Sequence, residues 1–319
     1  MMRRTIAAIV ILVAGATTPA CDRGSIAGEA AAPSLEELAS ATFAGVDDRT
    51  VTLVTGRWEG EPFVEGGASR PSIGLVDHFA LTGDLDGDDR EETAVLLRES
   101  SGGSGTRLYL AVMGRRHRNI VNLGTALVGD RVQVRSGGIR DGRIELDVVQ
   151  AGPEDAMCCP SQLATRRWAL GEGGLVEGEV TITGTLSLES LWGPEWVLSE
   201  LGWGEPAPDI AEIMISFHDD KVTGTGGCNR YFAAVTGGVP GELSFSGMGA
   251  TRMACPEPAM DLERRYLNVL ASASSYNFLG GRLVLGCDTD DGPAALIFTR
   301  REISSDPEHS QGGAGSGVE

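Results

Sequence analysis

The sequence predicts a mainly β protein with a few short helices, organised as two β-rich domains. Short apolar or alternating runs recur along most of the chain, and turns rich in Gly and Asp separate them, which is the pattern of antiparallel strands. Two segments, opening at Ser34 and at Pro258, carry the start signals of helices. A chain of 319 residues with 41% hydrophobic residues can build two ordinary cores.

Residues 34–180 form the first predicted domain. Ser34 with Glu37 three positions later is a capping box, and it predicts a short helix that continues to about Phe43. Asp141-Gly142 between two apolar runs predicts a tight hairpin turn. The predicted strands are Val51–Val54, Ile73–Leu81, Thr93–Leu97, Leu108–Met113, Arg131–Val134, Ile144–Val149 and Thr165–Leu170.

An acidic loop, residues 83–93, is the most distinctive segment of this domain. The carboxylates of Asp84, Asp86, Asp88 and Glu92 are spaced to place hard oxygens around one point, and Gly87 permits the tight turn, which suits Ca²⁺. The loop resembles the calcium loops of FG-GAP-type repeats, although Glu92 and the residue after Asp88 depart from that pattern. The alternative is an acidic hairpin turn whose side chains are solvated.

The amino terminus predicts export and membrane attachment. Arg3 and Arg4 precede an apolar run that ends before Ala20 and Cys21, and the run is too short for a membrane span. Residues 1–20 therefore read as a signal peptide and 21–33 as a tether. The segment resembles the leaders of bacterial lipoproteins, which implies a lipid-modified Cys21 that holds the protein at the membrane, facing the periplasm or the exterior. Cleavage after Ala20 that leaves Cys21 free is the alternative.

Two short motifs mark the second domain. The first is Gly226-Gly227-Cys228-Asn229-Arg230, and the second is Thr251, Met253, Cys255 and Pro256 in the pattern T-x-M-A-C-P, followed by Met260 and Glu263 on a predicted helix. Together they resemble the META domain, the HslJ-type domain of bacterial envelope proteins, over about residues 191–300. The resemblance implies a small antiparallel barrel-like sheet with one packed helix, and it implies no established chemistry.

The rest of the second domain fits that architecture. Trp196 resembles the core aromatic of the family's opening strand, and a helix over Pro258–Ala271 presents an apolar face that includes Tyr266. Residues 181–190 either close the first domain or open the second, and residues 301–319 predict a disordered tail. Further strands are expected at Ile210–Phe217, Lys221–Thr225, Tyr231–Val235, Glu242–Phe245, Arg282–Leu285 and Ala294–Phe298.

The cysteines allow several pairings in an exported protein. The META resemblance favours a Cys228–Cys255 disulfide and leaves Cys287 as the odd thiol. Pairing of Cys287 with either residue, or three buried thiols, are the alternatives. Adjacent Cys158 and Cys159 can form a vicinal disulfide, pair elsewhere or stay reduced.

Composition and motifs together favour a binding protein. The net charge of −19 argues against nucleic acid as a partner, and the four histidines form no triad or metal motif. The sequence thus predicts a non-enzymatic, membrane-tethered envelope lipoprotein that binds an envelope protein or a small ligand, or that serves stress tolerance. A metal-dependent hydrolase that uses the acidic loop, and a thiol redox sensor at Cys158–Cys159, are the competing hypotheses.

Overall fold

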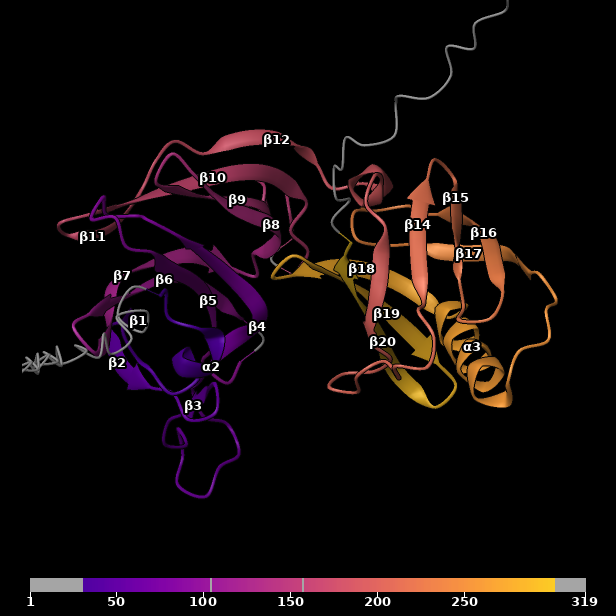
Figure 1. The fold of residues 1–319 in the computed structure, drawn as a ribbon, viewed down its shortest axis with the longest axis horizontal. Coiled ribbons are helices and arrows are strands. Elements are labelled where there is room, and N and C mark those ends of the chain that lie inside the picture. The colour runs from indigo at the N-terminus through magenta and orange to yellow at the C-terminus, as the bar shows by residue number, and fades with distance from the viewer. Residues whose placement is uncertain (1–30, 104, 157, 302–319) are drawn as a thin grey trace, which may run out of the picture.

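The computed structural model describes residues 31–103, 105–156 and 158–301, which form two strand-rich lobes (Figure 1). The described residues contain two α-helices, α2 (Leu35–Leu38) and α3 (Glu257–Leu270), and a short 3-10 helix, η1 (Leu188–Leu191), between the lobes. The predicted mainly β class with two β-rich domains is confirmed. The predicted signal segment, Cys21, most of the tether and nearly all of the tail lie outside the described residues.

A five-stranded antiparallel sheet lies at the centre of the first domain. It contains, in spatial order, β3 (Arg57–Glu59), β4 (Ser72–Gly83), β5 (Glu92–Ser100), β6 (Arg107–Arg116) and β7 (Asn119–Asp130). β5 and β6 are buried along most of their length because both faces of the sheet are covered. That burial explains why their sequences are almost continuously apolar rather than alternating.

Helix α2 and the hairpin of β1 (Thr42–Val46) and β2 (Arg49–Thr52) cover one face of this sheet. The predicted extension of the first helix to Phe43 is wrong, because α2 ends at Leu38. The carbonyl of Ala41 accepts the Leu53 N–H at 3.0 Å, and Phe43 lies opposite Val51 in the hairpin. Ladder hydrogen bonds therefore replace helical ones, and the strand buries Phe43 completely.

A second antiparallel sheet covers the other face. It contains β8 (Gln133–Arg140), β9 (Arg143–Gln150), β10 (Gln162–Gly171) and β11 (Gly174–Glu177), with β12 (Thr181–Thr185) paired to the start of β10. The two sheets enclose a core that includes Phe79, Leu96, Leu146 and Trp168. The pairing of β12 with β10 places residues 181–185 in the first domain, a point that the sequence left open.

Eight antiparallel strands form the second domain. In chain order they are β13 (Trp196–Glu200), β14 (Met214–His218), β15 (Lys221–Thr225), β16 (Arg230–Thr236), β17 (Ser244–Ala250), β18 (Ala273–Leu279), β19 (Arg282–Thr289) and β20 (Gly292–Arg300). β13 pairs with both β14 and β20, so β17 and β18 are the outer strands. The sheet curls until the segment before β17 meets β18, where the Leu243 N–H donates to Ser274 O at 3.1 Å.

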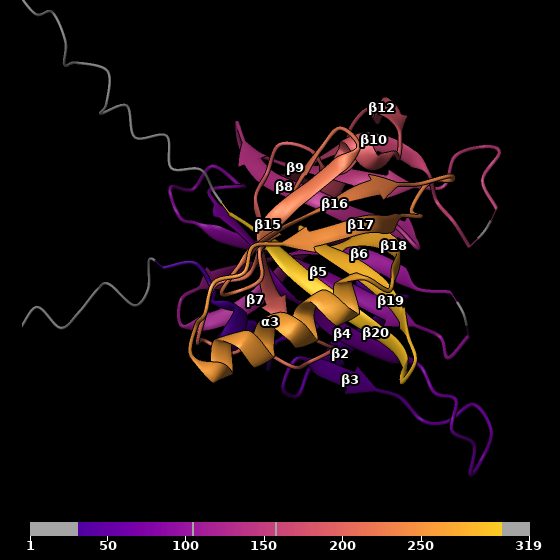
Figure 2. The same ribbon diagram turned by 90° about the vertical axis from the view of Figure 1, so that its right-hand side faces the viewer.

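Helix α3 packs on the curled sheet, against β19 and β20 (Figure 2). Its inner face carries Leu262, Tyr266 and Leu270, all buried and spaced at helical intervals. The predicted helix, Pro258–Ala271, is displaced by one residue at each end. The barrel-like sheet with one packed helix is confirmed.

The β18–β19 hairpin joins the two domains, and β18 lies beside β8 of the first domain (Figure 1). The Gly281 N–H donates to Val134 O at 2.9 Å, and the Phe278 N–H donates to Gln133 Oε1 at 3.0 Å. Leu279 packs against the core between the first domain's sheets. The turn of this hairpin therefore belongs to the second domain in sequence but packs into the first.

Candidate functional site

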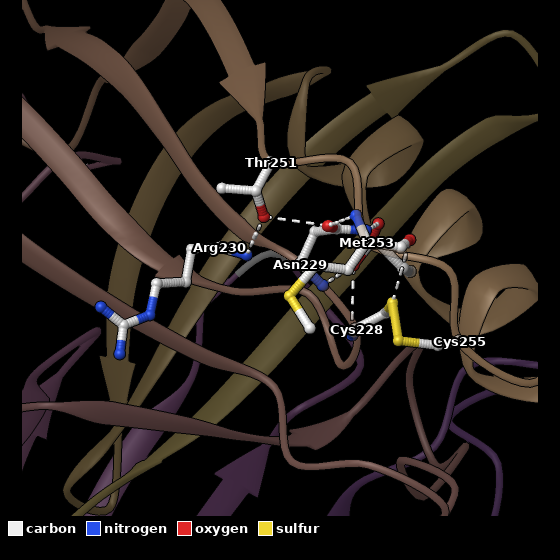
Figure 3. The surroundings of a disulfide bond; sticks show 7 residues. Cys228, Asn229, Arg230, Thr251, Met253 and Cys255 are labelled. Carbon is white, nitrogen blue, oxygen red and sulfur yellow. Dashed lines mark hydrogen bonds between the residues drawn. A yellow bond between two sulfur atoms is a disulfide. The ribbon is translucent and has the colours of Figure 1, made fainter.

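The two motifs of the second domain meet at a disulfide between the β15–β16 loop and the segment that enters α3 (Figure 3). The Sγ atoms of Cys228 and Cys255 lie 1.99 Å apart, and their Cα atoms lie 6.0 Å apart. The predicted pair is therefore at disulfide distance. Among the described cysteines Cys287 is the free one, and it is buried.

Asn229 is the buried centre of this site, with 6% of its surface exposed. Its Oδ1 accepts the Met253 N–H at 2.7 Å and the Thr251 hydroxyl at 2.9 Å. Its Nδ2 donates to Glu263 Oε1 at 2.9 Å. A buried amide is tolerated because these bonds replace the water it loses.

Glu263 fastens α3 to the same loop. Its Oε2 accepts the backbone N–H groups of Asn229 at 2.5 Å and Cys228 at 3.1 Å. Gly226 makes this approach possible, because a Cβ there would lie 2.8 Å from the Glu263 Cγ. Glu263 was not among the predicted site residues, and its place in the pattern after the second motif was the signal that could have identified it.

The remaining motif side chains point outward. Arg230 is exposed, and its backbone N–H donates to the Thr251 hydroxyl at 3.2 Å. Met253 is 62% exposed, and the side chain of Phe232, on the same strand as Arg230, is 59% exposed. The polar motif groups thus hold the loop together, while an arginine and apolar side chains face solvent.

Two tyrosines under the site are neutral structural groups. The hydroxyls of Tyr231 and Tyr266 lie 2.7 Å apart, and the Tyr231 hydroxyl also donates to Met214 O at 3.1 Å. Burial raises the pKa of both phenols. Burial also raises the pKa of the Cys287 thiol to about 12, so that thiol is protonated and unreactive at neutral pH.

The acidic loop of the first domain brings three of its four predicted ligands together. Oxygens of Asp84, Asp86 and Asp88 lie within 4.8 Å of one another. The same carboxylates also accept backbone hydrogen bonds that fix the shape of the loop. The Gly87 N–H donates to Asp84 Oδ1 at 2.7 Å, and the Asp88 N–H donates to Asp86 Oδ1 at 3.2 Å. The fourth predicted ligand, Glu92, does not belong to this group.

Glu92 instead lies in the interior at the start of β5. Its Oε2 accepts the Leu85 N–H at 3.0 Å, and its buried Oε1 has no hydrogen-bond partner among the described residues. Burial raises the pKa of this carboxyl, and the charges of Asp86 and Asp88 raise it further. Spacing alone did not reveal that β5 turns this side chain inward.

Arg116 is the positive charge beside this loop. Its Nη2 lies 2.5 Å from Asp86 Oδ2, and its Nη1 lies 3.7 Å from Glu92 Oε1 and 3.9 Å from Asp88 Oδ2. The guanidinium therefore partly neutralises the carboxylates that a cation would bind.

Cys158 and Cys159 form a vicinal disulfide on an exposed loop of the first domain. Cys158 and Pro160 also line a cavity of about 300 Å³ between the domains, next to Leu279 and Gly280 of the β18–β19 hairpin. A second cavity of about 460 Å³ adjoins it. Neither cavity is lined by Asp84, Asp86 or Asp88.

Residues 189–302 match the family model of the META domain. Two similar solved structures carry the titles "NMR structure of the protein from Burkholderia xenovorans" and "NMR structure of the protein". The first is 27% identical, with a TM-score of 0.29, over 36% of this chain and 86% of that chain. The second is 24% identical, with a TM-score of 0.29, over 35% of this chain and 93% of that chain. No curated protein matches the sequence.

Proposed function

From the META domain at residues 189–302, we propose that this protein is a non-enzymatic lipoprotein of the bacterial envelope whose domains bind a partner or a small ligand. META domains occur in bacterial envelope proteins. The observation that carries the non-enzymatic role is the network around Asn229. The polar groups of Glu263, Thr251 and the loop amides all form hydrogen bonds with one another. The motif therefore stabilises the fold and offers no free acid–base pair.

Attachment through Cys21 is the second part of the proposal. The basic leader, the short apolar run and the small residue before Cys21 support it. In the part of the chain that the structure describes, no helix is long and apolar enough to cross a membrane.

Cell fractionation of a Cys21→Ser variant tests the attachment. We expect the wild-type protein in the membrane fraction and the variant in the soluble fraction, because the variant lacks the thiol that carries the acyl chains. A Cys158→Ser/Cys159→Ser double variant, which removes the exposed vicinal disulfide of the first domain, is the matched control and should stay with the membrane. Retention of Cys21→Ser at the membrane would overturn the lipoprotein proposal.

Calcium binding by the acidic loop is a second proposal, supported by the convergence of Asp84, Asp86 and Asp88. Those oxygens fit a hard cation, and Glu92 would stay outside the first coordination sphere.

The competing hydrolase hypothesis would need a substrate cavity next to the ion, and the two interdomain cavities lie against other residues. The redox-sensor hypothesis concerns only Cys158–Cys159 and is independent of both.

A further inference from the structure

We propose that the cleft between the two domains binds a small organic anion with an apolar body. The inference deepens the binding role proposed above and rests on it, because it names the ligand class and the place where that ligand sits. Ligand sites commonly form at domain interfaces, in cavities of about 300–1,000 Å³.

The two interdomain cavities form one continuous cleft. They share Val76, Arg98, Thr106 and Leu279 as lining residues. Val76 and Arg98 come from β4 and β5 of the first domain, whereas Leu279 ends β18 of the second. The cleft therefore exists only when the β18–β19 hairpin is docked.

One end of the cleft has a mixed lining, in which apolar side chains lie beside the polar side chains of Arg131, Gln133 and Asn277. Leu96, Leu108, Phe278 and Pro160 line it, together with the shared Val76. Leu96 and Leu108 also belong to the core between the two sheets, so this end opens towards the hydrophobic interior. An aliphatic chain or an aromatic ring of a ligand would gain free energy by leaving water here.

The other end carries hydrogen-bond donors and positive charge. Ser72, Ser100 and Thr55 supply hydroxyl groups, and Arg57, Arg98 and Arg282 supply guanidinium groups. Asp77 is the single carboxylate among the described residues that line the two cavities. Arg57 and Arg282 form ion pairs with Glu59 and Glu200, so Arg98 supplies the positive charge that favours an anion in this protein of net charge −19.

Two arginines of the cleft have guanidinium N–H groups without a protein acceptor among the described residues. Arg98 is exposed and forms no ion pair with any carboxylate of the described residues, and it lines both cavities, at the junction of the two ends. The side chain of Arg282 is 7% exposed, and its Nη1 donates to Glu200 Oε1 at 2.7 Å. Its buried Nε has no hydrogen-bond partner within the described part of the chain. That Nε is shielded from solvent, so Arg98 is the arginine whose N–H groups a ligand can reach.

The combination sets the chemistry of the ligand. A carboxylate or sulfonate would bind Arg98 at the junction, and its apolar body would extend towards Leu96 and Phe278. Asp77 disfavours further negative charge at the polar end, so a monoanion fits better than a multiply charged ligand.

Fluorescence titration of the purified full chain with 1-anilinonaphthalene-8-sulfonate tests the proposal. Its parent compound without the sulfonate, N-phenyl-1-naphthylamine, is the uncharged control probe. We expect one saturable site for the sulfonate. Arg98→Gln should weaken it about tenfold, the loss expected for a charge-assisted hydrogen bond, and should leave the uncharged probe within about twofold. Arg143→Gln, an exposed arginine of the same domain outside the cleft, should change neither.

Thr106→Val provides a second variant at the junction that keeps the side-chain shape, and it should weaken the sulfonate selectively. Absence of saturable binding to the wild-type protein, or equal affinity in Arg98→Gln, would overturn the cleft proposal. Either result would leave the lipoprotein proposal standing, because the fractionation of Cys21→Ser tests it separately. Conversely, retention of Cys21→Ser at the membrane would refute membrane attachment through Cys21, even if the sulfonate still bound in the cleft.

Discussion

Glu263 binds Asn229 twice: its Oε2 accepts the Asn229 backbone N–H at 2.5 Å, and its Oε1 accepts the Asn229 side-chain amide at 2.9 Å. The two residues are 34 positions apart in the sequence, on a loop and on a helix. One carboxylate therefore fixes both the conformation of the loop and the seat of α3 on the sheet. The disulfide beside it fastens the same two segments covalently.

Replacing Glu263 with Gln tests that relationship. The variant keeps the size of the side chain but places an NH₂ group in the position of one oxygen, where it faces the two N–H donors of Oε2 or the one of Oε1. We expect the free energy of unfolding to fall by about 1–3 kcal/mol, because a partly buried donor loses its acceptor. Urea denaturation measures the change. Glu257→Gln, exposed at the start of the same helix, is the control, and it should cost no more than about 1 kcal/mol. Equal effects of the two variants would contradict the role given to Glu263.

The Cys228–Cys255 bond should contribute a large part of the second domain's stability. Replacing both residues with Ser frees a loop that spans a sequence separation of 27, and the chain-entropy model gives a loss of about 3–4 kcal/mol. Urea denaturation with and without reductant measures it, and reductant should bring the wild-type protein to the level of the variant. A Cys158→Ser/Cys159→Ser double variant is the control, since that bond closes almost no loop. Unchanged stability in the 228/255 variant would show that packing alone holds the loop.

Hydrophobic periodicity was enough to predict most of the fold. The strand at Lys221–Thr225 and the helix near Pro258 were found within a residue, because their apolar faces follow a single period. The strand β7 was missed, since bulges shift its pairing with β6 opposite Leu108 and Met113 of β6, and glycines interrupt its alternation. The helix predicted to reach Phe43 failed because tertiary hairpin pairing overrode local signals.

The candidate sites were harder to predict from the sequence than the fold. Asn229 and the cysteines belong to short motifs, but the partnership with Glu263 depends on a contact between distant segments. Spacing placed Glu92 with the aspartates, whereas the direction of β5 buries it. Arg98 and Leu279 line the same interdomain cavity, and no local sequence pattern predicts that two such distant residues come together.

The calcium proposal predicts that millimolar Ca²⁺ raises the melting temperature of the full chain relative to chelator. Stability should rise by about 2.7 kcal/mol when Ca²⁺ reaches about 100 times its Kd. Arg116→Gln should bind Ca²⁺ several-fold more tightly, because its guanidinium no longer opposes the ion at Asp86. Asp86→Asn should lose the response, and Asp141→Asn, an acid in another exposed turn, should keep it. If Ca²⁺ leaves the melting temperature unchanged, the loop does not bind Ca²⁺ and serves only as a turn between strands.

Glu92 predicts a specific pH dependence. Its pKa in the folded protein is raised above the ordinary 4.5, so the folded state holds this proton more tightly than the unfolded state. The contribution of Glu92 to stability is therefore greatest below pH 4.5 and is lost as the pH rises through the folded pKa. Glu92→Gln cannot ionise, so its stability relative to wild type should increase with pH across that window. Urea denaturation in chelator at several pH values measures the difference, and exposed Glu91→Gln should show no such trend. A flat difference for Glu92→Gln would contradict the cost of burying this charge.

Gly280 provides the test of domain docking. It lies at φ +56°, and a Cβ there would come within 2.8 Å of Val76 Cγ1 and 3.2 Å of Phe79 Cβ in the first domain. Gly247 lies at φ +61° in the second domain with nothing within 4 Å of such a Cβ. Both Gly→Ala variants therefore incur the same left-handed strain, about 1–2 kcal/mol, and only Gly280→Ala also meets the other domain.

We expect Gly280→Ala to lower the free energy of unfolding by about 1–3 kcal/mol more than Gly247→Ala, because β-branched Val76 has little freedom to move away. Hydrogen exchange gives a local readout, since the Gly281 N–H donates to Val134 O across the domain boundary at 2.9 Å. That amide should lose protection in Gly280→Ala and keep it in Gly247→Ala. If the two variants match in both stability and exchange, the hairpin contact does not hold the domains together, and the cleft that depends on it is not a fixed feature of the molecule.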